Sequence, residues 1–197
     1  MVENFNKKLE KYFKKRKICE LTTGLGYTKA SVAVVLNVVN NKLFVFFIKR
    51  TENTGDSYSG HVAFPGGKMS KVDAYPLDTA VRETAEEIGV NLNDSGHLLG
   101  RLDELKPLNP NGPKFIVSPF VFILKKNVNI KINKSEVENF MWIPFDYLAD
   151  KNNLRIRYKE RSGYVIEDYV YNYQEYLIWG MTGKIVNSFI KEVSVII

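Results

Sequence analysis

The sequence contains a single cysteine, Cys19, among 197 residues. One cysteine cannot form an intrachain disulfide, so the composition favours a reducing compartment such as the cytoplasm. Cys19 lies outside every motif described below. We interpret it as a passive small apolar residue rather than a nucleophile.

Long hydrophobic runs are also absent. The longest, residues 115–124, contains Ser118 and Pro119 and falls far short of the roughly 20 apolar residues that a membrane helix needs. The N-terminus carries lysines without an apolar segment, so we expect no secretory signal and no membrane partner. Repeats, low-complexity stretches and linkers are missing too. We therefore expect one domain over residues 1–197.

Basic residues outnumber acidic ones, 28 to 22, which gives a net charge of +6. Much of the excess lies in residues 3–17, where Leu9, Tyr12 and Phe13 add apolar positions to a basic amphipathic helix. Three interpretations remain open for this helix: a solvated helix packed on the domain, a nucleic-acid arm, or a membrane-surface helix. No interleaved aromatic and basic pattern elsewhere favours RNA, so nucleic acid is not an expected partner.

Residues 76–88 carry the signals of an amphipathic helix. Pro76 suits the first helical position, and Gly89 suits a left-handed cap at the end. Apolar or small residues recur at helical spacing and predict the buried stripe: Leu77, Val81, Thr84 and Ile88.

Three glutamates, Glu83, Glu86 and Glu87, share the opposite face of this helix, with roughly 5–6 Å between their Cβ atoms. Three adjacent carboxylates repel one another unless a cation lies among them. A hard divalent ion such as Mg²⁺ fits oxygen ligands and phosphate substrates. The alternative is a plain surface helix with solvated acids.

The run Arg82-Glu83-Thr84-Ala85-Glu86-Glu87-Ile88-Gly89-Val90 follows the glycine pair Gly66-Gly67. This pattern resembles the signature of the Nudix hydrolases, which cleave nucleoside diphosphates linked to another group with Mg²⁺ or Mn²⁺. The box spans about residues 67–90. The resemblance implies an α+β fold, an α/β/α sandwich in which helices flank a central mixed sheet.

The box is shifted, because Gly67 and Asp73 lie one residue upstream of the usual glycine and glutamate positions. The coenzyme A diphosphatase branch of the family shows the same offset. Three further segments resemble that branch: the lead-in at 60–67, Glu136-Val137 with Trp142-Ile143-Pro144, and residues 178–183. The lead-in departs from the branch pattern at 51–59. Gly55 or Asp56 stands near the usual arginine, and Tyr58 stands where a histidine is usual.

The resemblance also implies roles for individual residues. The metal would be held by Glu83, Glu86, Glu87 and the backbone carbonyl of Gly67. Arg82 would orient the glutamates by charge-assisted hydrogen bonds. The general base is open between Glu83 and Glu136, and Asp73 would form a salt bridge or assist the helix start. Substrate contacts are expected at Arg50, Phe64 and Gly66.

Two histidines, His61 and His97, invite a general-base interpretation, but we expect ordinary structural roles for both. Aromatic residues such as Tyr58 and Trp142 could stack on an adenine, although aromatic residues more often fill a core.

The remaining pattern predicts strands at 31–39 and 43–48, joined by a hairpin turn at 40–42, and further strands at 98–102, 155–157 and 164–166. Pro119 predicts that the strand at 115–124 is an edge or bulged strand. We expect a short turn or helix at 136–140, a closing helix at 173–193 that is broken near Gly180, and a loop at 106–113, substrate-facing or passive.

These observations predict a metal-dependent hydrolase of a diphosphate linkage, with coenzyme A or its thioesters as the first candidate substrate. A house-cleaning nucleoside triphosphatase and an ADP-ribose pyrophosphatase are alternatives within the class. A Nudix fold that only binds a ligand is the alternative from another class. A homodimer is compatible with the resemblance.

Overall fold

The computed structural model describes residues 2–22, 26–54, 58–107, 114–161 and 163–196. Gly55 and Asp56 of the lead-in, and residues 108–113 of the loop expected at 106–113, therefore lie outside the described residues. Within these ranges the helices are α1 (Val2–Lys15), α2 (Pro76–Ile88), α3 (Leu92–Ser95), α4 (Phe145–Ala149) and α5 (Gly180–Val193), with a 3₁₀ turn at Lys151–Asn153. The strands are β1 (Thr28–Val39), β2 (Lys42–Arg50), β3 (Val62–Ala63), β4 (Gly66–Lys68), β5 (Gly96–Arg101), β6 (Phe115–Leu124), β7 (Val137–Pro144), β8 (Leu154–Arg161), β9 (Tyr164–Tyr173) and β10 (Tyr176–Ile178).

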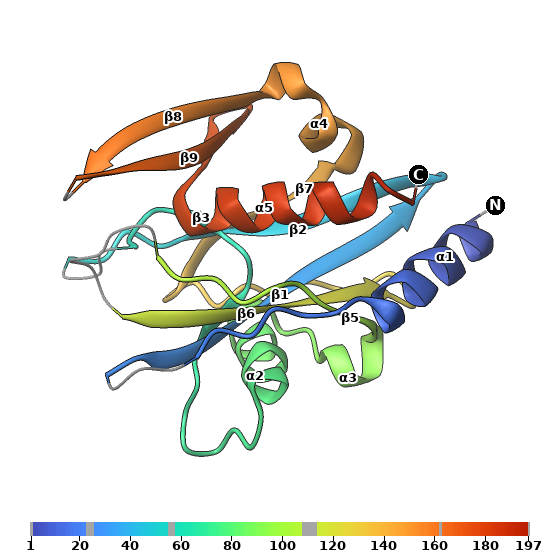
Figure 1. Cartoon of the computed structure of the whole chain (residues 1–197). Coiled ribbons are helices and arrows are strands. Elements are labelled where there is room, and N and C mark those ends of the chain that lie inside the picture. The colour runs from blue at the N-terminus through green and yellow to red at the C-terminus, as the bar shows by residue number, and fades with distance from the viewer. Residues whose placement is uncertain (1, 23–25, 55–57, 108–113, 162, 197) are drawn as a thin grey trace.

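The larger sheet has the strand order β3–β2–β1–β6–β5, with β4 paired to β1 and β7 paired to β2. β1 and β6 run parallel, whereas the other pairs are antiparallel, so the sheet is mixed as expected. A smaller antiparallel sheet has the order β10–β9–β8. Figure 1 shows its β8–β9 hairpin extending beyond the larger sheet.

Strand β1 pairs with two different strands along one edge, and this divergence creates the site. Residues 36–39 pair with β2, whereas residues 30–32 pair with β4. The opposite edge of β1 is taken by β6. Because β2 turns away from β1, the short strand with Gly66 and Gly67 fills the gap and lies against α2.

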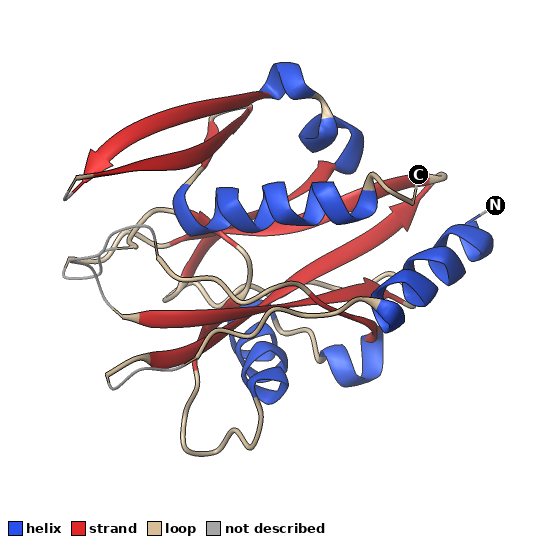
Figure 2. Cartoon of the chain, viewed as in Figure 1, coloured by secondary structure: helices blue, strands red, loops and turns tan. Residues whose placement is uncertain are grey.

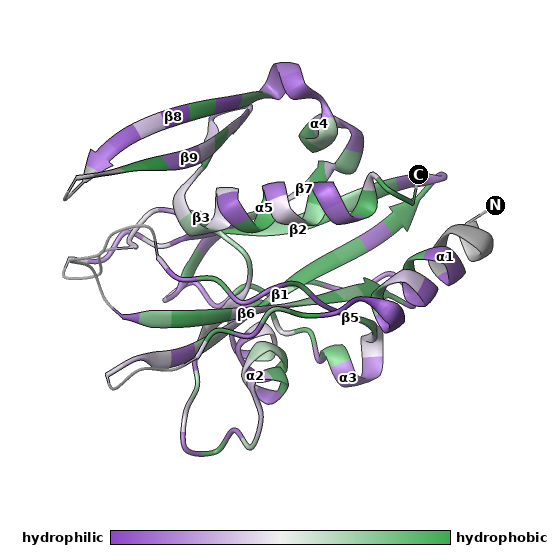
Figure 3. Cartoon of the chain, viewed as in Figure 1, coloured by the Kyte–Doolittle hydropathy of each residue, from purple (hydrophilic) through white to green (hydrophobic). Residues whose placement is uncertain are grey.

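Helices cover both faces of the larger sheet, as Figure 2 shows. Successive strand residues point to opposite faces, so Val34 and Phe47 join one buried cluster while Val35 and Phe46 join the other. The first cluster includes residues of α1, α4 and α5, and the second includes residues of α2 and α3. Figure 3 shows the green hydrophobic strands between these layers. The α/β/α sandwich is therefore confirmed.

Helix α1 packs on the domain through Leu9 and Phe13, which are both buried. Its lysines Lys7, Lys8, Lys11, Lys14 and Lys15 are exposed on the other side. Just after α1, Arg16 forms ion pairs with Glu192 at 2.8 Å and with Asp103 at 2.9 Å. The solvated helix packed on the domain is thus the interpretation that the structure confirms. Among the described residues, no helix is long and apolar enough to cross a bilayer.

The prediction of an edge strand at 115–124 was wrong, because β6 lies between β1 and β5. The carbonyl of Pro119 accepts a hydrogen bond from the Leu102 amide at 2.9 Å, just beyond the end of β5. A strand residue directs its N–H and C=O to the same neighbour. The nitrogen of Pro119, which carries no hydrogen, therefore points to a position where the regular pairing with β5 has already ended. The irregularity in the β5–β6 pair lies in β5.

Two helix predictions also need correction. Residues 137–144 form strand β7, because the free edge of β2 pairs with them from Phe44 to Arg50. Residues 173–193 are not one helix. Gln174 has a φ of 53° and turns the chain back, so Tyr176–Ile178 pairs with β9 before α5 begins at Gly180.

Candidate active site

Helix α2 forms as the sequence predicts. Pro76 is its first residue, and the Tyr75 amide donates to Asp78 Oδ2 at 2.8 Å, which closes the first turn. Gly89 has a φ of 70°, and its amide donates to the Ala85 carbonyl at 3.0 Å. This left-handed cap places the end of the helix directly after the glutamates.

The three glutamates of α2 lie in different environments, although the helical spacing predicts that all three share the face opposite the buried stripe. The side chains of Glu83, Glu86 and Glu87 are 16%, 52% and 1% exposed. At about 100° per residue, Glu87 is rotated by about 40° from Glu83 toward the buried Thr84, whereas Glu86 is rotated by about 60° away from it. The structure therefore buries Glu87 and leaves Glu86 at the rim.

The glycine turn at the start of β4 fits closely against these glutamates. The Gly66 amide donates to Glu87 Oε2 at 2.9 Å. Gly66 has a φ of 153°, and a Cβ there would lie 2.2 Å from the Ser31 carbonyl oxygen. A Cβ on Gly67 would lie 2.5 Å from Glu83 Cδ. The absence of a side chain thus lets the backbone at Gly66 pack against β1 and the backbone at Gly67 approach the Glu83 carboxylate.

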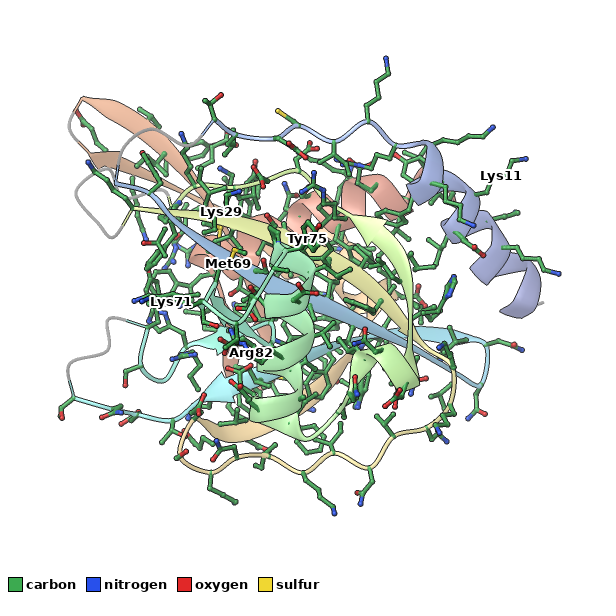
Figure 4. All side chains as sticks on the ribbon, turned by 90° about the horizontal axis from the view of Figure 1, so that it is seen from below. Lys11, Lys29, Met69, Lys71, Tyr75 and Arg82 are labelled. Atoms are coloured by element: carbon green, nitrogen blue, oxygen red, sulfur yellow. The ribbon has the colours of Figure 1, made fainter. Side chains whose placement is uncertain are left out.

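Arg82 links the glutamates to the loop before the helix. Its Nε and Nη2 donate to the two oxygens of Asp73, each at 2.9 Å. Its Nη1 lies 2.8 Å from Glu83 Oε1 and 2.9 Å from Glu86 Oε2. Figure 4 shows Arg82 on the face of α2, beside the loop that carries Met69 and Lys71. The guanidinium is placed to orient both carboxylates.

Asp73 is buried and receives further hydrogen bonds from the Ser70 amide and from the hydroxyls of Ser70 and Thr79. The Arg82 guanidinium, opposed by burial and helped by these donors, holds the pKa of Asp73 well below its usual range. Asp73 therefore stays ionised and anchors Arg82. The sequence suggested a salt bridge, but it did not identify Ser70 and Thr79 as partners, because nothing in their spacing from Asp73 marks them.

The electrostatics of the glutamates favour a cation. Burial raises the pKa of Glu83, against the opposing effect of Arg82, and Glu86 and Glu136 raise it further. Burial raises the pKa of Glu87 to about 8, although the Gly66 amide and Arg50 act in the opposite direction. Desolvation and mutual repulsion both penalise these negative charges, so a bound cation would relieve both.

Arg50 and Glu136 border the same carboxylates. Arg50 Nη1 lies 3.7 Å from Glu87 Oε1. Glu136 is exposed at the turn before β7, where Asn133 Nδ2 donates to its Oε1 at 3.1 Å, and its charge acts on both Glu83 and Glu87. The Asn133 amide also donates to the Glu87 carbonyl at 2.8 Å. Asn133 is a link to α2 that no sequence signal indicated.

Phe64, for which a substrate contact is predicted, lies in the buried cluster that also contains Phe47. Its side chain is buried, and its ring centroid lies 4.7 Å from that of Phe47. This ring packs in the core rather than facing the glutamates. His61 likewise contacts Trp179, at 4.7 Å between ring centroids, and His97 Nε2 lies 3.6 Å from Glu10 on α1. Both histidines contact residues outside α2.

The donors suit a hard divalent ion in type, since they are carboxylates and a backbone carbonyl. Within the described ranges, however, no three side chains of His, Cys, Asp or Glu converge as a metal site, because Glu83 and Glu86 turn to Arg82. The Arg82 guanidinium engages Oε1 of Glu83 and Oε2 of Glu86. The close approach of the Gly67 backbone to the Glu83 carboxylate is the feature that brings two donor types together.

A mixed sheet between helices and an acidic helix packed on a glycine turn make up the fold and its candidate site, and comparisons with known proteins give the family. The NUDIX domain family matches residues 28–168, which is more than half of the chain. The chain belongs to this family, whose members are pyrophosphohydrolases that act on nucleotide derivatives and generally need divalent metal ions.

Two relatives cover most of the chain. An uncharacterized Nudix hydrolase, NudL, from Photorhabdus laumondii is 30% identical over 163 residues, which covers 83% of this chain and 84% of the relative. A NudL protein from Yersinia enterocolitica is 28% identical and covers 83% of this chain and 81% of the relative.

Solved structures support the fold. A NUDIX hydrolase from Alicyclobacillus acidocaldarius matches with a TM-score of 0.50 and 20% identity, over 64% of this chain and 82% of that one. A MutT/nudix family protein from Enterococcus faecalis has a TM-score of 0.51 and 13% identity, over 98% and 74% of the two chains.

Proposed function

We propose that this protein hydrolyses the diphosphate linkage of coenzyme A or its thioesters, in the presence of Mg²⁺ or Mn²⁺. The products are a 4′-phosphopantetheine and adenosine 3′,5′-bisphosphate. The observation that carries the reaction type is the packing of Glu83 and Glu87 against the Gly66-Gly67 backbone. A binding-only protein has no need to keep all three glutamates of α2, and Glu83, Glu86 and Glu87 are all present.

The proposed substrate rests on the lead-in at 60–67 and on the one-residue shift of the box. The structure gives this shift a physical account. Asp73, one residue upstream of the usual acid, reaches both Nε and Nη2 of Arg82. Asp73 can therefore hold Arg82 from this shifted position while Arg82 still contacts Glu83 and Glu86. This supports the assignment of the chain to the branch whose box is one residue longer.

In the proposed mechanism, water attacks one phosphorus of the diphosphate, and a phosphate ester leaves. The carboxylates of Glu83, Glu86 and Glu87 and the carbonyl of Gly67 would hold the divalent ion. When bound, this ion neutralises charge on the phosphate oxygens and lowers the pKa of the attacking water.

The other residues act by position. Arg82, fixed by Asp73, orients Glu83 and Glu86. Glu83 is the first candidate for the general base, because it is partly buried beside Gly67. Glu136 is the second, since it approaches the same carboxylates from outside the helix. Arg50 would contact a phosphate oxygen of the substrate, and its position 3.7 Å from Glu87 Oε1 supports this role.

The experiment is a substrate panel with Mg²⁺ and Mn²⁺: coenzyme A, ADP-ribose, NADH, dinucleoside polyphosphates and deoxynucleoside triphosphates, with products identified by mass. We expect coenzyme A or a thioester to give the highest kcat/KM. If coenzyme A ranks among the poorest substrates, the substrate assignment fails. ADP-ribose or triphosphates would then take its place within the same class.

Two wider assignments belong to this proposal. We assign residues 1–197 to one domain, because a single buried cluster contains residues from Leu9 in α1 to Val193 in α5. We also assign the protein to the cytoplasm, and the free, exposed thiol of Cys19 supports a reducing compartment.

A further inference from the structure

A second group of charged and aromatic side chains surrounds Trp179, just before α5. Arg157 Cζ lies 5.6 Å and Lys159 Nζ 5.1 Å from the centre of the Trp179 ring. The His61 ring lies 4.7 Å from the same ring. We call His61, Arg157, Lys159 and Trp179 the Trp179 cluster. It joins β8 of the smaller sheet to the segment before β3, two regions that Figure 1 shows on the same side of the molecule.

The cluster holds more positive than negative charge. Asp168, whose side chain is 2% exposed, accepts from Arg157 Nη2 at 2.7 Å and from Lys159 Nζ at 2.8 Å through Oδ2. Its Oδ1 accepts from the Gly180 amide at 2.9 Å. One carboxylate thus faces two cations and the N-terminus of a helix, so one positive charge remains uncompensated within this set.

This excess charge faces solvent on ordered side chains. The side chains of Arg157 and Lys159 are 32% and 38% exposed. Asp168 fixes one donor of each, and the Trp179 ring supports both by cation–π contact. The remaining donors are held in place before any ligand arrives. Such preorganisation lowers the entropy cost of binding an anion.

The cluster is connected to the glutamates through Arg50. The Arg50 amide donates to the His61 carbonyl at 3.0 Å, while its guanidinium lies 3.7 Å from Glu87. Thr182 Oγ1 at the start of α5 donates to the Val62 carbonyl at 3.1 Å. Val62 belongs to the strand that leads directly to Gly66. The cluster and the glycine turn are therefore joined by one short stretch of chain, residues 61–66.

Aromatic contacts extend the same surface toward β4. The Tyr58 ring lies 6.2 Å from that of His61 and 6.5 Å from that of Phe115. Lys68 Nζ lies 5.3 Å from the centre of the Phe115 ring. Cationic and aromatic side chains thus follow one another from the cluster to the residue next to Gly67. This alternation is suited to the base and phosphates of a nucleotide.

We propose that the Trp179 cluster binds a phosphomonoester group of the substrate, separate from the diphosphate that is cleaved, through Arg157 and Lys159. The proposal rests on the proposed function, and it deepens that function by naming the substrate feature that this surface selects. In coenzyme A the group is the phosphomonoester on the adenosine ribose. A doubly charged phosphate fits this surface because charge-assisted hydrogen bonds to ordered cations are its strongest contacts.

The kinetic test compares coenzyme A with 3′-dephospho-coenzyme A, which lacks only this group. We expect the wild-type protein to prefer coenzyme A by about 10-fold or more in kcat/KM, and Lys159→Met to remove most of this preference through KM. Turnover of the dephospho compound should be unchanged in the variant. Lys159→Arg, which keeps the charge, should retain the preference. Lys42→Met, at the first residue of β2, is the matched control for loss of one exposed lysine.

A binding test separates this proposal from the reaction. Calorimetry with adenosine 3′,5′-bisphosphate and with AMP needs no turnover, so it applies even if coenzyme A is not hydrolysed. We expect the bisphosphate to bind about 10-fold more tightly, and Lys159→Met to abolish the difference. Equal affinity of the two nucleotides, or equal loss for both in the variant, overturns the phosphomonoester site. Absence of coenzyme A hydrolysis with a preserved difference overturns only the proposed substrate.

Discussion

Replacing Gly67 with alanine should separate activity from stability. The new methyl group would lie 2.5 Å from Glu83 Cδ and 2.6 Å from both carboxylate oxygens. Carbon atoms in contact prefer about 3.5–4.0 Å, so the carboxylate must withdraw by about 1 Å. The obstructing atoms are the end of a flexible side chain, and this movement costs little folding energy. A misplacement of about 1 Å at a reacting group, however, costs about 100-fold in rate.

Gly66→Ala is the matched comparison, because its methyl group meets backbone instead of a side-chain end. That group would lie 2.2 Å from the Ser31 carbonyl oxygen and 2.6 Å from Val32 Cα, at a φ of 153°. Backbone cannot withdraw cheaply, and such overpacking costs about 1–3 kcal/mol. For a domain of this size, the melting temperature should fall by about 2–12 °C.

The assay is kcat/KM on the best substrate of the panel, measured beside thermal unfolding followed by circular dichroism. We expect Gly67→Ala to lose about 100-fold in kcat/KM with an unchanged or slightly higher melting temperature. Gly66→Ala should show the lower melting temperature of the two. Full activity in Gly67→Ala, or a loss of activity that only follows a loss of stability, would refute the reasoning.

Two further predictions concern stability. Leu9→Ala leaves a cavity at a fully buried position between α1 and the sheet. The free energy of unfolding, measured by chemical denaturation, should therefore fall by about 2–5 kcal/mol. A change below about 0.5 kcal/mol would mean that α1 is not docked. Burial opposes the ionisation of Asp168, but Lys159, the Gly180 amide and Arg157 lower its pKa below the usual value. A group with a lowered pKa in the folded state stabilises the fold at pH values above its unfolded pKa, which is about 4 for Asp. The melting temperature of wild type should therefore exceed that of Asp168→Asn fully at pH 7, and the difference should shrink below about pH 4. Calorimetry that shows a pH-independent difference would contradict this.

The sequence predicts the local elements well where the signals are local. Pro76 and Gly89 mark both ends of α2, and the turn at Asn40 and Asn41 forms with φ values of 50° and 61°. These outcomes depend on backbone preferences of single residues, which do not need the rest of the fold.

The errors arise where a distant segment decides the structure. Residues 137–144 become a strand because β2 offers a free edge, and Pro119 is tolerated inside the sheet because β5 ends beside it. Neither fact can be read from a local window. For the same reason, the position of β6 inside the sheet could not be predicted from its own residues.

In the candidate site, too, local spacing predicts some features and distant segments decide the others. Helical spacing predicts that Glu83, Glu86 and Glu87 lie together, but it does not give their burial, which depends on β4 filling the gap beside β1. The Trp179 cluster brings together β8, the segment before β3 and the start of α5, which are far apart in the sequence. Only the pairing of β8 with β9 places Asp168 next to Arg157 and Lys159.

The central claim is that the glutamates of α2 carry diphosphate hydrolysis. The most direct measurement is steady-state coenzyme A hydrolysis with Mg²⁺ by wild type, Glu83→Gln, Glu87→Gln and the double variant, each checked for its melting temperature. We predict a loss of orders of magnitude in kcat for each variant. Melting temperatures should be unchanged or, for the buried Glu87, higher, because glutamine neither buries a charge nor needs the proton uptake that the raised pKa of Glu87 implies. Unchanged turnover in a folded double variant would contradict the account.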